Sequence, residues 1–223
     1  MCGRFTLTGD LAKFAESIGA KGIAKKKPRY NICPTQDVAV VLNLEPRAIS
    51  TVKWGLIPFW AEDPKIGNSL ANARSEGIES KPSFRSPFKR QRCLVLADGF
   101  YEWQKVPGSK AKVPHYFRLK SHDVFGFAGL WDVWADPAGA EIQTCCLITT
   151  TPNSLMEPIH DRMPVILHQM DYDIWLSAYE KPSDQLVPLL KPYPASEMES
   201  HPVSTLVNRP QNDEARVIEP VGQ

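Results

Sequence analysis

Residues 93–104 read Cys-Leu-Val-Leu-Ala-Asp-Gly-Phe-Tyr-Glu-Trp-Gln, and this stretch decides the fold. Its first part, Cys93–Leu96, is a short apolar run, and its second part, Phe100–Gln104, is rich in aromatic residues. Both compositions are typical of strands, and the glycine between them is a common strand boundary. The stretch therefore predicts two successive β-strands.

Strand composition continues on both sides of this stretch. Upstream, Val38–Leu42 and Ala48–Trp54 lie on either side of a turn-like segment with Pro46, which predicts a hairpin. Downstream, further segments of strand composition, several bounded by Gly or Pro, predict strands at Tyr116–Leu119, Val124–Leu130, Gln143–Thr149 and Val165–Leu167. The chain is therefore predominantly β.

Helical periodicity is confined to short segments. Asp10 is a suitable N-cap for a helix in which Leu11, Phe14 and Ile18 fall on one face, and Gly19 would end it. The period returns at residues 172–179 and 186–190, and alternating parallel βαβ units are not evident. We predict one α+β domain over residues 1–223, with a predominantly antiparallel, curved or barrel-like β-sheet and flanking helices.

Composition narrows the class of protein. With 223 residues and 43% hydrophobic content, the chain can bury a sizeable core. It has neither an apolar run of membrane-spanning length nor a signal-peptide core, so we expect a cytoplasmic protein, associated with the nucleoid if the source is bacterial. A monomer is the default expectation. An odd number of cysteines without a C-x-x-C pair argues against disulfides and structural zinc, and no metal or cofactor is expected. The remaining cysteines are interpreted as core residues: Cys33, Cys93, Cys145 and Cys146.

Charge is distributed unevenly along the chain. Residues 1–120 hold 21 Lys and Arg against 10 Asp and Glu, whereas residues 121–223 hold 5 against 15. A basic face able to attract a polyanion would follow if this segregation persisted on the folded surface. The alternative is that the charges of the two halves mix when the chain folds.

Cys2 carries the most distinctive chemistry. Because its side chain is small, the initiator methionine can be trimmed, which leaves an amine and a thiol on neighbouring carbons. The amine titrates at about pH 8 and the thiol at about 8.5. Part of the amine is therefore unprotonated at neutral pH and can attack an aldehyde to form a Schiff base, after which the thiol can close a thiazolidine ring. The alternative is an ordinary N-terminal residue.

Four other segments combine function-capable side chains. Trp54–Trp60 holds three aromatic residues suited to stacking on nucleobases, although a buried Trp54 is an equally good interpretation. Asn72–Glu76 includes Arg74, and the basic run 81–92 includes Arg85, so both suit phosphate binding or an exposed loop. Glu102 lies among aromatic residues, where it is either salt-bridged or has a raised pKa. His160–Pro164 unites a histidine, an acid and Arg162.

Six ordered blocks together resemble the SOS response-associated peptidase family, and the resemblance covers almost the whole chain. The blocks are Met1–Phe5, Tyr30–Thr35, Trp54–Pro58, Asn72–Glu76, Asp98–Trp103 and Ile159–Pro164. The family captures abasic sites in single-stranded DNA through its N-terminal cysteine. The resemblance therefore implies that the partner is single-stranded DNA containing abasic sites, and that the product is a DNA–protein crosslink formed during the DNA damage response.

The resemblance also implies roles residue by residue. Cys2 would be the covalent residue, Asn72 would position the sugar and the cysteine, Glu102 would assist proton transfer, and His160 would help to open the sugar and to reverse the link. Arginines would contact DNA phosphates, and an aromatic side chain would stack near the lesion. These DNA-binding residues are Arg4, Arg74, Arg162 and Trp60, to which the basic run adds Arg85.

Two other functions stay open at this point. In the first, the Cys2 thiolate attacks an amide, as in an N-terminal-nucleophile peptidase or amidohydrolase. In the second, the chain is a non-catalytic module that binds single-stranded DNA through Trp60 and the basic segments. The first requires turnover of an amide substrate, and the second predicts binding without a covalent product.

Overall fold

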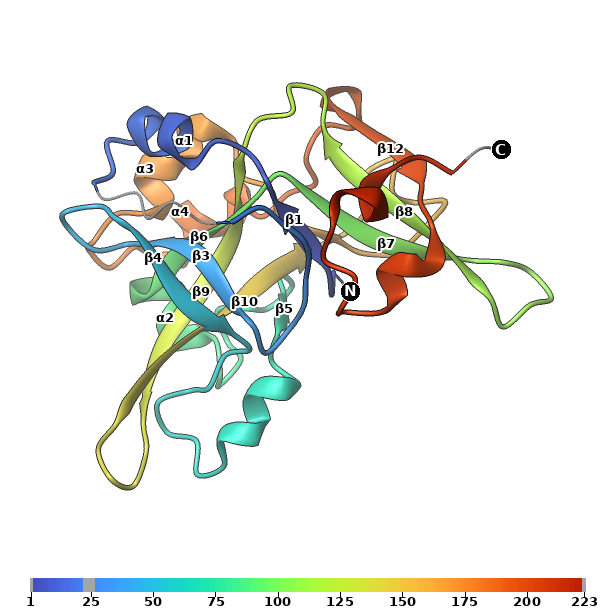
Figure 1. Cartoon of the computed structure of the whole chain (residues 1–223). Helices are drawn as coiled ribbons and strands as arrows, with labels where there is room; N and C mark the ends of the chain where they lie inside the picture. The colour runs from blue at the N-terminus through green and yellow to red at the C-terminus, as the bar shows by residue number, and fades with distance from the viewer. Residues whose placement is uncertain (1, 22–26, 222–223) are drawn as a thin grey trace.

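The computed structural model describes residues 2–21 and 27–221, and its centre is a closed β-barrel (Figure 1). Five strands pair in the order β10-β4-β3-β6-β9, and β9 pairs back to β10. Every pairing in this ring is antiparallel except that of β4 with β10. The prediction of a barrel-like, predominantly antiparallel α+β fold is therefore confirmed. The strands are β3 (Asp37–Leu42), β4 (Ile49–Trp54), β6 (Arg92–Ala97), β9 (Phe125–Ala135) and β10 (Glu141–Thr150).

A second, open sheet adjoins the barrel, and the stretch 93–104 joins the two. β6 belongs to the barrel, whereas β7 (Gly99–Lys105) belongs to the open sheet. Gly99 stands at the change of sheet, where a Cβ would lie 2.2 Å from the Tyr116 hydroxyl oxygen, so only glycine fits. The order of the open sheet is β12-β8-β7-β1-β2. Its other strands are β1 (Phe5–Leu7), β2 (Arg29–Ile32), β8 (Lys112–Leu119) and β12 (Met198–Pro202).

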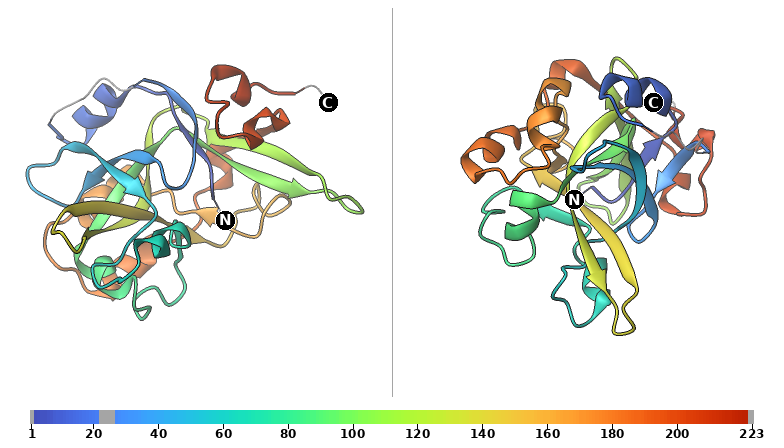
Figure 2. Two further views of the ribbon diagram at one scale, coloured as in Figure 1. Left: turned by 60° about the horizontal axis from the view of Figure 1, so that its bottom comes forward. Right: turned by 90° about the vertical axis from the view of Figure 1, so that its left-hand side faces the viewer.

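Short helices lie around the sheets (Figure 2). The Asp10 carboxylate caps α1 (Leu11–Ser17) by accepting from the amides of Ala12 and Lys13, as the sequence predicts. The other α-helices are α2 (Arg85–Arg90), α3 (Tyr172–Trp175) and α4 (Ser183–Leu186). The 3₁₀ helices are η1 (Pro64–Asn68), η2 (Gln169–Asp171), η3 (Val187–Leu189), η4 (Ala195–Glu197), η5 (Thr205–Asn208) and η6 (Ala215–Ile218).

One predicted strand is wrong, and five short strands of the described chain, β1, β2, β5, β11 and β12, were not predicted. The strand in this region is β11 (Met163–Pro164), whereas Val165–Leu167 forms only an isolated bridge, between Ile166 and Phe127 of β9. Val165 donates to Ile148 in β10 and accepts from Ala128 in β9, so the segment passes between two strands instead of forming a ladder with one. Among the unpredicted strands, β5 (Asn72–Arg74) pairs in parallel with β10.

Burial and ion pairing decide whether Trp54 lies in the core and whether the charges of the two halves of the chain mix. Trp54 is fully buried and donates to the Ala71 carbonyl at 2.8 Å, so it is a core residue. The four cysteines predicted to be core residues are all buried. Charges from the two halves of the chain pair with each other, as in Arg47–Asp173 at 2.7 Å and Arg90–Glu180 at 2.9 Å. Folding therefore mixes the charges that the sequence segregates. None of the helices within the described ranges has the length and apolar character needed to span a bilayer.

Candidate active site

The candidate site lies where the N-terminal end of β1 meets the barrel (Figure 1). β1 pairs with β7, and the Tyr101 amide donates to the Arg4 carbonyl at 3.0 Å, which extends the contact toward the N-terminus. Cys2 follows in this direction and is fully buried. Its thiol donates to the Arg4 carbonyl at 3.7 Å. The short pairing of β1 thus delivers Cys2 beside Glu102, while Met1 lies outside the described residues.

Asn72 reaches Cys2 from the barrel side. The parallel pairing of β5 with β10 fixes Asn72 opposite Leu147. From this position, the Asn72 side-chain amide donates to the Cys2 carbonyl at 2.9 Å. Its Oδ1 is buried and has no hydrogen-bond partner among the residues that the structure describes. Because a buried polar atom without a partner is unfavourable, this acceptor is suited to a donor that arrives with a ligand.

Glu102 and His160 form a pair beside Cys2. The distance from Glu102 Oε2 to His160 Nε2 is 3.7 Å, and the Glu102 side chain is almost fully buried. Burial raises the pKa of Glu102 to about 7, which places its ionisation at physiological pH. The sequence left open whether this carboxyl is salt-bridged or has a raised pKa; it lies near a histidine and its pKa is raised.

A main-chain contact favours one tautomer of His160. Its Nδ1 accepts from the Arg162 amide at 3.0 Å, which favours the neutral ring with the proton on Nε2, the nitrogen that faces Glu102. The Asp161 carboxylate lies 3.1 Å from the same Nδ1. Burial lowers the pKa of His160, which favours the neutral ring. The pair therefore presents a carboxyl poised to exchange a proton and a neutral imidazole with its N–H toward that carboxyl.

The Cys2 thiol is held in its protonated form. Burial raises its pKa, and the nearby negative charge of Glu102 raises it further. A nucleophilic thiolate needs the opposite surroundings, with positive charge or a helix N-terminus to lower the pKa. The site is therefore suited to chemistry that begins at the amine and uses the thiol later.

Two of the predicted phosphate-binding arginines already have protein partners. Arg4 donates to the Asn31 side chain at 2.8 Å and to the carbonyls of Val207 and Asn208 at 2.6 and 3.2 Å. Arg162 makes two hydrogen bonds to the Glu76 carboxylate, at 2.6 and 2.9 Å. It also donates to the main-chain oxygen of Thr149, at 2.6 Å. Both arginines thus help to assemble the site, in addition to their predicted role in phosphate binding.

The other predicted DNA-binding residues lie on the surface. Arg74 is exposed on β5, two residues beyond Asn72, and Arg85 is exposed at the start of α2. Trp60 is 47% exposed, in a loop whose Phe59 amide donates to the buried Asp132 carboxylate at 2.9 Å. Among the interactions of the described residues, none joins Arg85 or Trp60 to the group of Cys2, Asn72, Glu102 and His160.

Asn31 supports the site, although no role was predicted for it. It is fully buried in β2, and its amide nitrogen donates to the carbonyls of Val207, Arg209 and Asn212 at 3.1, 3.0 and 2.9 Å. Its oxygen accepts from Arg4. Asn31 therefore ties the segment 207–212 to the residue that precedes β1. A polar residue within a strand beside apolar Ile32 is the sequence signal that points to such a role.

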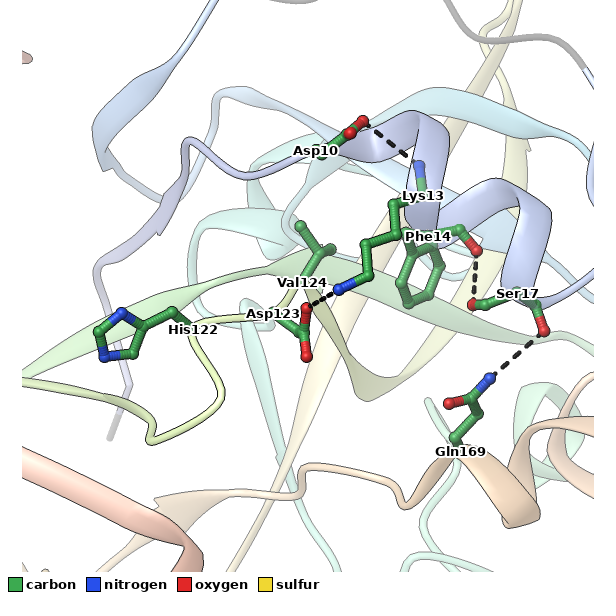
Figure 3. Close-up of a pocket in the computed structure, with 8 residues that line it drawn as sticks. All are labelled: Asp10, Lys13, Phe14, Ser17, His122, Asp123, Val124 and Gln169. Atoms are coloured by element: carbon green, nitrogen blue, oxygen red, sulfur yellow. Dashed lines mark hydrogen bonds and ion pairs between the residues drawn. The ribbon is translucent and has the colours of Figure 1, made fainter.

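The surface has one pocket beside the Glu102–His160 pair and another at α1. One, of about 550 Å³, adjoins the Glu102–His160 pair and is lined by Trp103, Lys105, Lys112, Pro152, Glu157, Pro158, Ile159, His160 and Asp161. The other, of about 300 Å³, lies at α1, is bridged by an ion pair of 2.5 Å between Lys13 and Asp123, and shares no residue with the first (Figure 3). In the described ranges, no cluster of His, Cys, Asp and Glu is arranged to hold a metal ion.

Comparisons with known proteins identify the family and agree with the fold. A protein-family model, described as SOS response associated peptidase (SRAP), matches residues 1–210. The chain is 43% identical over 223 residues to the abasic site processing protein YoqW of Bacillus subtilis (strain 168), covering 98% of this chain and 99% of YoqW. It is 33% identical to the abasic site processing protein HMCES of Gallus gallus, covering 87% of this chain and 67% of HMCES. A crystal structure of a protein from Bacteroides thetaiotaomicron is similar with a TM-score of 0.88 and 26% identity, covering 99% of this chain and 100% of that one.

Proposed function

The chain belongs to the SOS response-associated peptidase family, and from this premise we propose that it captures abasic sites in single-stranded DNA by a covalent bond to Cys2. Relatives named as abasic site processing proteins match it over almost its whole length. The observation that supports the proposal best is the convergence of Asn72, Glu102 and a neutral thiol on the N-terminal residue. We place this reaction in the response to DNA damage.

The proposed reaction has two bond-forming steps. After removal of Met1, the Cys2 amine attacks the aldehyde of the ring-opened sugar, and loss of water gives a Schiff base. The thiol sulfur then adds to the Schiff-base carbon, and the thiol proton is transferred to the nitrogen. The product is a thiazolidine that joins protein and DNA. No oxidant or reductant is needed, because the thiol adds across the carbon–nitrogen double bond.

Glu102 and His160 are suited to the proton transfers. Ionised Glu102 lies close enough for its charge to affect the Cys2 thiol, and with a pKa of about 7 it can accept a proton and release it again. The Nε2–H of neutral His160 faces that carboxyl. In this proposal, His160 also assists ring opening of the sugar and reversal of the crosslink, and Asn72 holds the Cys2 main chain in position.

The DNA strand is proposed to contact Arg4, Arg74, Arg85, Arg162 and Trp60. Arg74 and Arg85 have exposed guanidinium groups that can meet phosphates, and the exposed ring of Trp60 offers a surface on which a base can stack, worth about 1–3 kcal/mol. Arg4 and Arg162 would contact DNA with the donors that their protein partners leave available.

The geometry does not favour the amidohydrolase alternative. That reaction starts from a thiolate, and both burial and the charge of Glu102 raise the pKa of the Cys2 thiol. The passive-binding alternative does not explain why Asn72 and Glu102 surround a buried Cys2, because DNA binding alone does not require these contacts. Both alternatives predict that no stable, lesion-dependent adduct forms.

Intact-mass measurement tests the proposal. Untagged protein is incubated with a single-stranded oligonucleotide that carries one abasic site, beside an undamaged oligonucleotide. The expected product has the mass of protein plus DNA minus one water and survives denaturation without reductant. Cys2→Ser keeps the amine but not the thiol, so its Schiff base should survive only after borohydride reduction. Absence of any adduct from protein that has lost Met1 would refute covalent capture.

A further inference from the structure

The pocket beside the catalytic pair has two chemically different sides. One side comes from the turn end of the β7–β8 hairpin, which extends outward beyond the rest of the open sheet (Figures 1 and 2), and it contributes Lys105 and Lys112. The other side comes from the segment 152–161, and it contributes Glu157 and Asp161. A hydrogen bond of 3.2 Å from the Gln104 amide to the Pro158 carbonyl joins the two sides. The hairpin side is basic and the opposite side is acidic.

The two lysines face each other without an acid between them. Lys105 and Lys112 are direct partners in the β7–β8 ladder, and in the described part of the chain neither takes part in an ion pair. No acidic residue occurs between Glu102 and Asp123, so the hairpin itself offers no counter-charge. Like charges directly opposite each other destabilise a strand pair, and a bound anion would remove this repulsion.

Lys112 is also close enough to influence the reaction centre. The pKa of Glu102 is raised mainly by burial and the pKa of His160 is lowered mainly by burial, and the charge of Lys112 lowers both values. The charge of Asp161 acts in the opposite direction on both groups. A ligand held between the lysines would therefore lie next to the atoms that react with the abasic sugar.

We propose that Lys105 and Lys112 bind a backbone phosphate of the DNA strand adjacent to the abasic nucleotide, so that the strand leaves the site along the β7–β8 hairpin. Glu157 and Asp161 repel the phosphates and keep the strand away from the opposite side of the pocket. A phosphate fits the two ammonium groups, because lysine binds phosphate as a point charge. The inference rests on the proposed function, because it extends the path of the same DNA strand.

Equilibrium measurements of DNA affinity test the phosphate contact of the two lysines separately from covalent bond formation. Cys2→Ala protein and an oligonucleotide with a tetrahydrofuran in place of the abasic sugar form no covalent bond, so they report affinity alone. Lys105→Gln should weaken binding by about two- to fivefold, the range of an exposed charge pair. Lys105→Gln with Lys112→Gln should reduce the slope of log affinity against log salt by about 0.7, since the two lysines neutralise one phosphate and each neutralised phosphate of single-stranded DNA contributes about 0.7.

The direction of the strand gives a sharper test. Two series of oligonucleotides, extended on only the 5′ or only the 3′ side of the tetrahydrofuran, should differ. The double variant should lose affinity for one series and keep it for the other. The matched control is Lys53→Gln with Lys120→Gln, which removes two exposed lysines that do not line this pocket.

The pH dependence of the crosslinking rate provides a second test of Lys112, and a purely structural role of Lys112 would not change it. Lys112→Gln should raise the pKa of Glu102 and so move the midpoint of the crosslinking rate to higher pH, whereas Lys105→Gln and Lys112→Arg should leave the midpoint in place. Binding equal to that of the control, or an equal loss for both series, would overturn the inference. If wild-type protein forms the Cys2 adduct in that case, only this inference fails; if it forms none, the proposed function fails.

Discussion

The side-chain amide of Asn72 lies 2.9 Å from the main-chain carbonyl oxygen of Cys2, to which it donates a hydrogen bond. The two residues are 70 positions apart, and the parallel pairing of β5 with β10 brings them together. The orientation of Cys2 therefore depends on a strand of only three residues.

We expect Asn72→Ala to slow crosslinking at saturating DNA by about tenfold or more. Without the amide, the Cys2 carbonyl loses its donor and the amine is no longer held in one position, which corresponds to about 1–3 kcal/mol. Rates from single-turnover mass measurements check this, with binding of the tetrahydrofuran oligonucleotide as the control for affinity. An unchanged rate would show that Asn72 does not position Cys2.

The rate should depend on the ionisation of Glu102. Because burial raises its pKa to about 7, the carboxylate that accepts a proton is abundant above this pH and is lost below it. Glu102→Gln should reduce the rate by roughly 100-fold, in the range for general acid–base catalysis. The ratio of wild-type to variant rates should fall as pH decreases through about 7, because the titration of the Cys2 amine is common to both proteins. A constant ratio would argue that Glu102 has a structural role.

The same carboxyl should lower stability at high pH. Its pKa is about 7 in the folded protein and 4.5 as the unperturbed value, so between these pH values the folded state binds the extra proton. Wild-type stability should therefore decrease, relative to Glu102→Gln, as pH rises from about 4.5 to 7. Above pH 7 the variant should be more stable by about 1–3 kcal/mol. Urea unfolding at acidic and alkaline pH measures this difference, and a variant that is less stable at both would contradict the prediction.

The ion pair of Arg162 with Glu76 makes a further test possible. The Arg162 guanidinium holds the pKa of Glu76 below its usual range, so the carboxylate compensates the arginine charge at neutral pH. If Arg162 contacts a phosphate, Glu76→Gln should strengthen binding of the tetrahydrofuran oligonucleotide by about two- to fivefold. Arg162→Gln should weaken it. Exposed Glu79 provides the control substitution, Glu79→Gln. Weaker binding by Glu76→Gln would indicate that the pair only supports the site.

A blocked N-terminus should abolish capture. A protein that retains Met1 or carries an N-terminal tag has no amine on Cys2, so the Schiff base that precedes the thiazolidine cannot form there. Binding of the tetrahydrofuran oligonucleotide should persist, because the DNA-binding side chains are intact. Mass analysis of processed and unprocessed protein in one preparation provides the comparison. Undiminished adduct on the unprocessed form would exclude the thiazolidine mechanism.

Much of the fold follows from local composition, and its exceptions have physical causes. The apolar and aromatic runs that predict strands become β3, β4, β6, β7, β8, β9 and β10. Val165–Leu167 has the same composition, yet it follows Pro164, which lacks the amide needed to continue a ladder. β5 is too short and too polar to show strand periodicity. Closure of the barrel depends on pairing between β9 and β10, whose register local composition does not reveal.

The candidate site likewise combines residues that were predicted with supporting contacts that were not. The resemblance to a family identified Cys2, Asn72, Glu102 and His160, and the structure brings these four together. The supporting contacts of Arg4 and Asn31 were not predictable, because their acceptors include main-chain carbonyls of residues 207–212. Main-chain carbonyls are present in every residue, so the sequence contains no signal for which of them will be used.

The origin of the site in four distant chain segments has a consequence for biosynthesis. Cys2 is translated well before Asn72 and Glu102, and the group is complete only once His160 has been made, past two thirds of the 223-residue chain. Until then, the N-terminal aminothiol of a nascent chain has no neighbouring carboxyl or imidazole to move its protons. Its reactivity toward free cellular aldehydes is then that of any simple cysteine. The enhanced reactivity of the site arises only when most of the chain has been made and folded.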